Sequence, residues 1–372
     1  MHPDFLPTGK PVVGRRRGYG ELPLDKRLGV GILGLHEGHT LLVALRASGL
    51  CRAVAGCDLA EEKRAAARLA CPDLHVYERY EDMLADPEVR IVALYTPDPM
   101  HADHIAQAFR AGKHVICTKP LLTSLERAEE LLALAQDSGV RLQVGQSTRF
   151  FEPFQRQREL FESGAMGEVE VLDAHYVHRM DWWYEKSPWT QGSTHWAFLG
   201  LSHPIDLARW YLGEIDEVHA LGSISRLART YGMPSPDILC VNLRAADGRV
   251  ARVFGHYGVS EHPQGRSLIE CWLMGSEGSS VARYPDLRLT YALERDGIEH
   301  EENYEHAMSG YYFRHELKGM HYGEFCNYAD YFASKLLSGE PNSPDLAEGI
   351  GTVAVLVAVV RSLESGQPVR VG

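Results

Sequence analysis

The chain has 372 residues, of which 45% are hydrophobic, and it carries a formal net charge of −12. This length is typical of two domains with substantial cores, and the acidic balance argues against nucleic acid or an anionic membrane as the main partner. The seven cysteines include no CxxC pair, which indicates the reduced thiols of a cytoplasmic protein rather than a disulfide framework. No apolar run reaches about 18 residues, so we expect no membrane-spanning helix.

Residues 1–27 are rich in proline, glycine and arginine and lack hydrophobic periodicity, so we expect an N-terminal arm. From Leu28 onward, apolar runs of strand length alternate with helical patterns. The expected strands are 28–34, 51–58, a short one near Val76, 90–96, 114–119 and 141–147. The expected helices are 39–49, 59–70, 80–85, 101–112 and 124–139. Near-continuous apolar strands joined by helices are typical of a parallel sheet covered on both faces, and six such strands predict the doubly wound arrangement that binds dinucleotides.

The pattern changes after residue 150. A helix is expected at 153–164, and two further helices are expected near the end of the chain, within 324–338 and 345–365. Between them lie long stretches of alternating polar and apolar residues, at 168–180, 217–228, 238–246, 250–259 and 268–277. Alternation over such lengths indicates a large, mostly antiparallel open sheet with one solvated face. We therefore expect an α/β protein, with a dinucleotide-binding domain at 28–148 and an α+β domain for substrate binding and oligomerisation at 149–372.

The turn after the first expected strand reads GLHEGH. The pyrophosphate of a dinucleotide binds where unpaired N–H groups begin a helix, and glycines let the backbone come close to it. Gly34 fits the first position of the usual GxGxxG fingerprint, His36 and His39 replace the other two glycines, and Gly38 comes one residue early. We expect these four residues to form a cofactor-binding turn; the alternative is a strand–helix turn without a ligand.

Three further positions lie at the carboxyl edge of the sheet, where open α/β sheets bind ligands. Asp58 closes the second strand, where an acid binds the ribose hydroxyls of NAD and repels the extra phosphate of NADP, so we favour NAD; the alternative is that Asp58 only caps the next helix. Thr96, Pro97 and Asp98 follow the fourth strand and are expected beside the cofactor, although the same residues also form ordinary turns. Lys119 ends the fifth strand, where desolvation would lower its pKa; an ordinary exposed lysine is the alternative.

The motifs around these positions resemble those of the Gfo/Idh/MocA family, named for glucose–fructose oxidoreductase, inositol dehydrogenase and a rhizopine-catabolism protein. The most specific block is LYTPDPMHADHIAQAFRAGKHVICTKP, from Leu94 to Pro120. It contains a TP after the fourth strand, a downstream HA, a GKHV, and the last two positions of a terminal EKP whose first position is Thr118 here. The segments STRFFEPF, SGAMGEV and SHPIDLARWYLG also match, and the resemblance covers about residues 28–372.

This resemblance implies an oxidoreductase that transfers a hydride between a nicotinamide cofactor and a hydroxyl or carbonyl group of a sugar, polyol or related compound. Lys119 would contact the nicotinamide ribose and a substrate hydroxyl, and His203 would be the acid–base group. In such enzymes the Lys–Pro peptide bond is often cis, as we expect for Lys119–Pro120. Besides Thr96 and Pro97, His101 and Pro120 are expected at the cofactor. The residues expected at the substrate are Arg149, His195 and Asp206.

The chemistry of His203 can also be argued from its position. Ser202 is expected to N-cap a helix over 203–212, which puts His203 at the positive end of the helix dipole and favours a neutral imidazole that can act as a base. Asp206 lies three residues further on and can share its helix face. The family's aspartate four residues before this histidine is Leu199 here. That substitution motivates an alternative, a nucleotide- and sugar-binding regulatory protein of the same fold that has lost catalysis.

Two further expectations concern metals and partners. His175 and His178 are an odd number of residues apart on an expected strand, so they point to opposite faces and we predict no metal site. The open face of the second sheet indicates self-association as a homodimer or homotetramer. The remaining expected partner is a small-molecule sugar or polyol.

Overall fold

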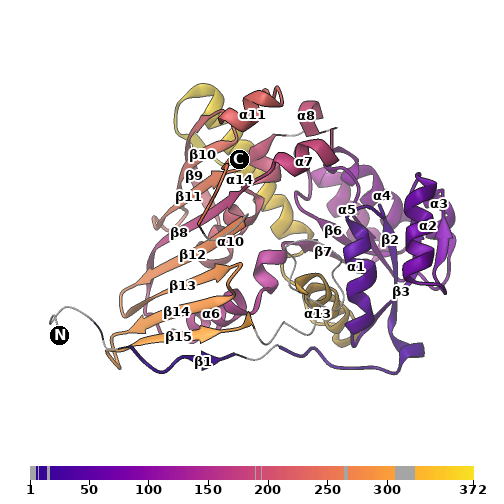
Figure 1. The fold of residues 1–372 in the computed structure, drawn as a ribbon, viewed down its shortest axis with the longest axis horizontal. Coiled ribbons are helices and arrows are strands. Elements are labelled where there is room, and N and C mark those ends of the chain that lie inside the picture. The colour runs from indigo at the N-terminus through magenta and orange to yellow at the C-terminus, as the bar shows by residue number, and fades with distance from the viewer. Residues whose placement is uncertain are drawn as a thin grey trace. The chain divides into compact units, whose positions relative to one another are not determined.

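The computed structural model describes residues 6, 8–14, 17–188, 190–193, 195–263, 267–305 and 323–372 (Figure 1). They divide into two compact units. The parallel-sheet unit takes its described residues from 17–150 and 309–351, and the mixed-sheet unit takes its own from 1–16, 151–308 and 352–372. The division at residue 150 is close to the expected boundary at 148. It differs from the expected domains in two respects, because the arm is shared between the units and the helix at 324–338 groups with the parallel sheet.

Six parallel strands form the sheet of the parallel-sheet unit, in the order β4-β3-β2-β5-β6-β7. They are β2 (Leu28–Leu33), β3 (Cys51–Cys57), β4 (His75–Tyr77), β5 (Ile91–Leu94), β6 (His114–Thr118) and β7 (Leu142–Gly145). The helices between them are α1 (Gly38–Ala44), α2 (Glu61–Ala70), α3 (Tyr80–Ala85), α4 (His101–Arg110) and α5 (Ala128–Ser138), with short 3₁₀ helices η1 (Leu24–Lys26), η2 (Leu45–Ala47), η3 (Asp98–Met100) and η4 (Ser147–Phe150). Because both faces are covered, the central strands are apolar throughout, and the predicted doubly wound sheet is confirmed.

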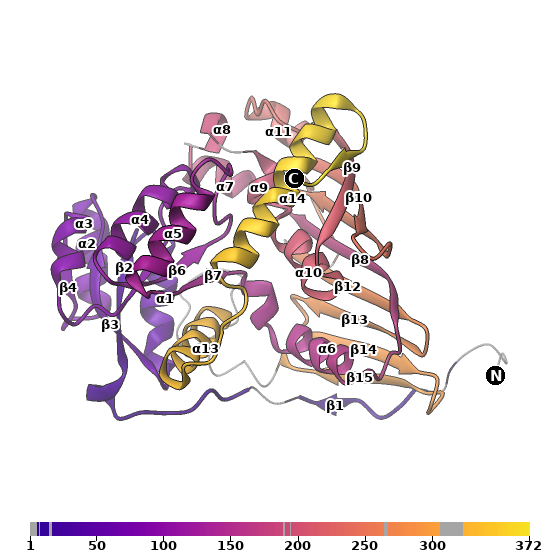
Figure 2. The same cartoon turned by 180° about the vertical axis from the view of Figure 1, so that it is seen from behind.

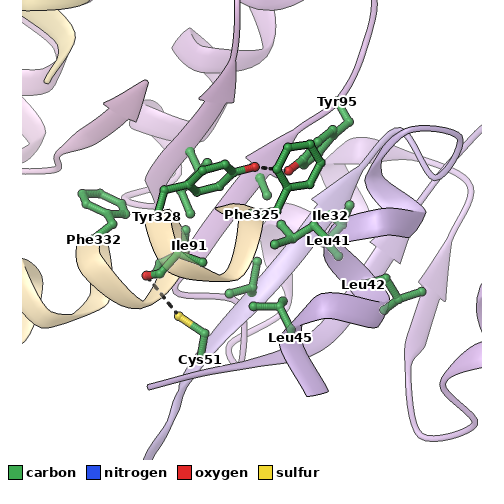
Figure 3. Packing of buried hydrophobic residues seen from close by; sticks show 14 of the residues in the cluster. Ile32, Leu41, Leu42, Leu45, Cys51, Ile91, Tyr95, Phe325, Tyr328 and Phe332 are labelled. Atoms are coloured by element: carbon green, nitrogen blue, oxygen red, sulfur yellow. Dashed lines mark hydrogen bonds between the residues drawn. The ribbon is translucent and has the colours of Figure 1, made fainter. Parts of the chain in front are cut away.

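The helix α13 (Glu324–Ser338) completes this unit, although it comes from the far end of the chain. It packs beside α1, and Figure 3 shows its side chains Phe325, Tyr328 and Phe332 among the buried residues of the parallel sheet. The hydroxyl groups of Tyr95 and Tyr328 share a hydrogen bond. The helix α13 therefore contributes to the core beneath the first two strands and α1.

The mixed-sheet unit is built on ten strands within the described residues, in the order β1-β15-β14-β13-β12-β8-β11-β10-β9-β16 (Figure 2). They are β1 (Val12–Val13), β8 (Val169–His178), β9 (Ile215–Ser223), β10 (Ile238–Ala245), β11 (Val250–His256), β12 (Ser267–Gly275), β13 (Gly278–Tyr284), β14 (Arg288–Leu293), β15 (Glu299–Asn303) and β16 (Val369–Arg370). Neighbours are antiparallel except for β8 with β11 and β1 with β15. The predicted mostly antiparallel sheet is confirmed, and part of the N-terminal arm forms its edge strand β1.

Helices cover one face of this sheet. α6 (Glu152–Glu162) packs on β13 and β14, and α10 (Ser202–Leu212) packs on β8, β11 and β12. The shorter helices of the unit are α7 (Asp181–Lys186), α8 (Thr190–Ser193), α9 (Trp196–Leu199) and α11 (Arg226–Thr230). The other face carries exposed apolar side chains, including Leu221, Val250 and Trp272.

The last helix, α14 (Leu346–Ser365), is the one helix of the described residues that is long and apolar enough to cross a membrane, and half of that stretch is buried within the protein. The expectation concerned an uninterrupted apolar run, and Glu348 and Arg361 interrupt the apolar sequence of this helix. Ser362 accepts a hydrogen bond from the N–H of Ala220 on β9 (2.9 Å). This pairing and the burial of its apolar residues are those of a core helix.

Candidate functional site

The carboxyl ends of β2, β3, β5 and β6 meet at one edge of the parallel sheet, and the strand order reverses between β2 and β5. Ligands of open α/β sheets bind in the crevice at such a reversal. The residues predicted to bind the cofactor follow these strands, with 34–39 after β2, Asp58 after β3, Thr96 and Pro97 after β5, and Lys119 after β6. The fold therefore gathers them at one edge.

The turn after β2 depends on two glycines. Gly34 has a φ of +86°, and a Cβ atom there would lie 2.6 Å from the carbonyl oxygen of Tyr95. A Cβ on Gly38 would lie 2.5 Å from the side chain of Ile32 on β2. Gly38 thus permits the close packing of helix on strand that the third glycine of the fingerprint usually provides. It stands one residue before the usual position of that glycine, because α1 begins at Gly38 itself.

The two histidines of this turn differ in environment. The side chain of His36 is 39% exposed, and its Nε2 lies 3.9 Å from the carboxylate of Glu37. His39 lies inside α1, where burial and then the positive charges of Arg46 and Lys63 lower its pKa. His36 is therefore the one with an accessible ring beside the turn.

Asp58 joins the turn to the end of β3. Its Oδ2 accepts a hydrogen bond from the N–H of Leu35 (2.8 Å), and its Oδ1 accepts one from the N–H of Ala60 (2.9 Å). Asp58 therefore both supports the glycine turn and orders the residues that lead into α2. Each carboxylate oxygen keeps a second lone pair for a ribose hydroxyl. Together with the two glycine positions that exclude a Cβ, this arrangement fits a dinucleotide with an unmodified ribose.

His101 connects the ends of β5 and β6. The ring is 1% exposed, its Nε2 lies 2.9 Å from the carbonyl oxygen of Thr96, and its Nδ1 lies 2.9 Å from that of Pro120. Burial lowers the pKa of His101, while the two carbonyl contacts act in the opposite direction. Because both ring nitrogens are directed to backbone carbonyls, we propose that His101 holds the two turns in place rather than binding the cofactor through its ring.

Lys119 follows β6 and is only partly exposed. Burial lowers the pKa of Lys119 to about 8, and the carboxylates of Asp98 and Glu37 oppose this effect. The Lys119–Pro120 peptide bond is cis, as expected. A lysine whose pKa lies this close to neutrality can both donate and accept a proton under physiological conditions. Glu37 was missing from the predicted site, although an acid inside the glycine turn was visible in the sequence.

Arg149 lies in η4, which follows the carboxyl end of β7, and its side chain contacts the later part of the chain. Its side chain is 3% exposed, its Nη1 donates to the hydroxyl of Ser343 (2.9 Å), and it forms an ion pair with Glu348 (3.5 Å). These contacts tie η4 to the segment that leads into α14. Its predicted role in substrate binding gains no support from this environment.

His203 belongs to the mixed-sheet unit, whereas Lys119 belongs to the parallel-sheet unit. His203 is 6% exposed, and its ring stands edge-on to that of Tyr176 on β8, with 5.8 Å between the ring centroids. Asp206 lies one turn further along α10 and is 1% exposed. The predicted N-cap is wrong: α10 begins at Ser202, and Leu201, with helical backbone angles and no capping side chain, is its N-cap residue. The short helix α9 ends immediately before, so the chain enters α10 already in a helical conformation.

His195 is the N-cap residue of α9. Its Nδ1 accepts a hydrogen bond from the N–H of Ala197 (3.0 Å), so the neutral ring carries its proton on Nε2. Burial lowers the pKa of His195, and the negative charge of Glu364 acts in the opposite direction. On β8, His175 bonds to Asp173 on the open face, whereas His178 lies beside Tyr176 on the other face, as the spacing predicted.

Family models match both halves of the chain. The model described as an oxidoreductase family with an NAD-binding Rossmann fold matches residues 28–146, and the model of the GFO/IDH/MocA C-terminal domain matches residues 154–281. The chain belongs to the Gfo/Idh/MocA family. It is accordingly an NAD-binding oxidoreductase, and the fold and cofactor expected from the sequence are confirmed.

Individual relatives agree with this assignment. An uncharacterized oxidoreductase of Schizosaccharomyces pombe is 37% identical over 109 residues, which cover 29% of this chain and 30% of that protein. The inositol 2-dehydrogenase of Mycolicibacterium smegmatis is 27% identical over 360 residues, which cover 92% of this chain and 94% of that enzyme. The solved structure of levoglucosan dehydrogenase in complex with NADH and levoglucosan has a TM-score of 0.78 and 23% identity, and the match covers 93% of this chain and 99% of that one.

Proposed function

We propose that this protein is a dehydrogenase that transfers a hydride between NAD and the hydroxyl-bearing carbon of a sugar or polyol. The observation that carries the proposal is the partly buried Lys119, with a pKa near 8, on the same sheet edge as the glycine turn and Asp58. The full-length similarity to inositol 2-dehydrogenase and the fold shared with levoglucosan dehydrogenase support a polyhydroxylated substrate.

In this proposal, NAD when bound supplies the hydride acceptor. Asp58 would accept hydrogen bonds from the ribose hydroxyls, and the turn that Gly34 and Gly38 permit, packed closely on Tyr95 and Ile32, would hold the pyrophosphate at the start of α1. Lys119 donates a hydrogen bond to the substrate oxygen and so favours loss of its proton. His203 takes up that proton; edge-on contact with Tyr176 holds its ring, since the family's aspartate is replaced by Leu199. His195 and Asp206 are proposed to shape the substrate side.

The proposal is tested by turnover with NAD and a panel of sugars and cyclic polyols, followed by NADH absorbance. Lys119→Ala and His203→Ala should each lower kcat/KM by at least about a hundredfold while NAD still binds. Lys335→Ala and His219→Ala are matched controls on α13 and β9 and should stay active. Full activity in both site variants would contradict the assigned roles. NAD binding without turnover of any compound would instead favour the regulatory protein.

We also propose that the protein is cytoplasmic and forms a homodimer or homotetramer. All seven cysteines are free thiols, which supports a reducing compartment. Exposed apolar side chains on β9, β11 and β12, along one face of the mixed sheet, support self-association. Cell fractionation tests the first statement: recovery of the protein with membranes would contradict it.

A further inference from the structure

Four charged or titratable side chains surround the end of β6 in the parallel-sheet unit. Glu37 precedes α1, Asp98 opens η3, His101 opens α4, and Lys119 follows β6. Asp98 and His101 are buried, with exposed fractions of 4% and 1%. The carboxylate of Asp98 is close enough to Lys119 and to His101 to raise the pKa of each against the lowering effect of burial. Asp98 is therefore an electrostatic neighbour of both groups.

Contacts of the His101 ring with two backbone carbonyls, one of which receives the N–H of the neutral ring, hold Asp98 in this place. The carbonyl of Thr96, two residues before it, and the carbonyl of Pro120, directly after Lys119, both lie 2.9 Å from ring nitrogens of His101. Asp98 lies between Thr96 and His101 in the sequence and begins the 3₁₀ helix η3, whose C-cap residue is His101. The bridge made by His101 thus fixes the segment that carries Asp98 relative to the turn that carries Lys119.

We propose that Asp98 is a positioning residue that keeps Lys119 protonated at neutral pH, so that the lysine meets the substrate oxygen as a hydrogen-bond donor. This inference rests on the proposed function, in which Lys119 contacts the substrate hydroxyl. A neutral amine would accept a hydrogen bond from that hydroxyl instead and would stabilise the developing alkoxide poorly. Burial alone drives Lys119 toward this neutral form.

Asp98 contributes more to this effect than Glu37. The side chain of Glu37 is 33% exposed, so solvent screens its charge, whereas Asp98 is almost fully buried. Removal of the buried charge should therefore have the larger consequence. Without it, the charged form of Lys119 would lose the main interaction that opposes the effect of desolvation.

The test is a direct titration of Lys119 without substrate or cofactor. The chain has eight lysines, so protein labelled with ¹³C-lysine gives few Cε resonances, and Lys119→Arg identifies the one in question. In the unaltered protein the pKa of Lys119 should lie near 8. In Asp98→Asn it should be lower by about one pH unit. Glu37→Gln should shift it in the same direction by less.

Asp103→Asn is the matched control, because Asp103 lies on α4 but is exposed and paired with Arg127 (2.6 Å). It should leave the titration of Lys119 unchanged. An unchanged Lys119 pKa in folded Asp98→Asn would overturn the proposal. Asp98→Ser removes the same charge with less volume; if neither variant folds, Asp98 is a requirement of folding and the proposal fails as well. Since no turnover is measured, absence of activity on every polyol would count against the proposed function alone.

Discussion

At the scale of single residues, Asp58 shows how one carboxylate serves both the fold and cofactor choice. One of its oxygens accepts from the N–H of Leu35 in the glycine turn, and the other accepts from Ala60 before α2. A negative charge fixed at the end of β3 favours ribose hydroxyls and repels a ribose phosphate.

Asp58→Asn should therefore weaken the preference for NAD over NADP by about tenfold, which corresponds to about 1.4 kcal/mol. The amide can accept through only one atom, so binding of both cofactors should weaken somewhat as the turn loosens. The ratio of the two dissociation constants separates the effect of charge from this loosening. Fluorescence titration with NAD and with NADP measures the two dissociation constants. Asp73→Asn is the control, because Asp73 is exposed. An unchanged ratio would assign Asp58 to the fold alone.

Residues of this site differ in how far the sequence predicts them. Gly34, Asp58 and Lys119 follow apolar strands, and the carboxyl ends of parallel strands meet at one edge, so their grouping could be inferred from strand order. The surroundings of Arg149 could not, because its partners Ser343 and Glu348 come from a segment nearly 200 residues later. The orientation of both ring nitrogens of His101 toward carbonyls depends in the same way on the folded backbone.

At the scale of elements, α13 is a helix whose existence was predicted but whose partner was not. The spacing of apolar residues predicts which face of a helix is buried, but it does not predict which sheet that face packs against. Asp330 on α13 accepts hydrogen bonds from the Ser48 hydroxyl and from the N–H groups of Gly49 and Leu50 (both 3.1 Å), at the start of β3. These bonds connect residues about 280 positions apart, so the end of the chain is part of the parallel-sheet unit.

Asp330→Ala should destabilise the protein by about 2–4 kcal/mol, because three donors near the start of β3 lose their acceptor in a buried site. Thermal unfolding followed by circular dichroism should show a lower Tm. Asp137→Ala, on the exposed side of α5, removes the same group and should change stability by less than about 0.5 kcal/mol. Equal effects of the two substitutions would mean that the Asp330 contacts contribute little.

Most strands that the sequence did not predict, namely β1, β13, β14 and β15, lie at one side of the mixed sheet, whereas β16 forms its opposite edge. β15 reads EHEEN, a composition rarely found in strands. Its carboxylates are balanced by arginines on other elements, since Glu301 pairs with Arg288 on β14 and Glu302 pairs with Arg156 on α6. Local propensity was overridden here by partners that only the folded chain supplies.

At the scale of the whole molecule, the open face of the mixed sheet is the feature to explain. The register places Leu221 opposite Cys240 on β10, and it places Trp272 opposite Asp173 on β8. Val171 on β8 lies opposite both Val250 and Met274. All of these positions share one face, which carries apolar side chains together with charges of both signs, as Asp173 and Arg252 illustrate. Such a mixture suits a symmetric contact between two copies, in which each acidic position can meet a basic one.

If two copies meet through this face, Trp272→Lys should weaken their association by at least about thirtyfold, as loss of a central tryptophan typically costs about 2 kcal/mol. Lysine at this position lies opposite Asp173, so the strand itself should remain stable. Light scattering over a dilution series would detect the shift toward single chains. Leu69→Lys is the control, because Leu69 is 86% exposed on α2 in the other unit. A single-chain mass for the unaltered protein at micromolar concentration, or equal masses for both variants, would exclude the sheet face as the contact, because a lysine ammonium buried in that contact would weaken association.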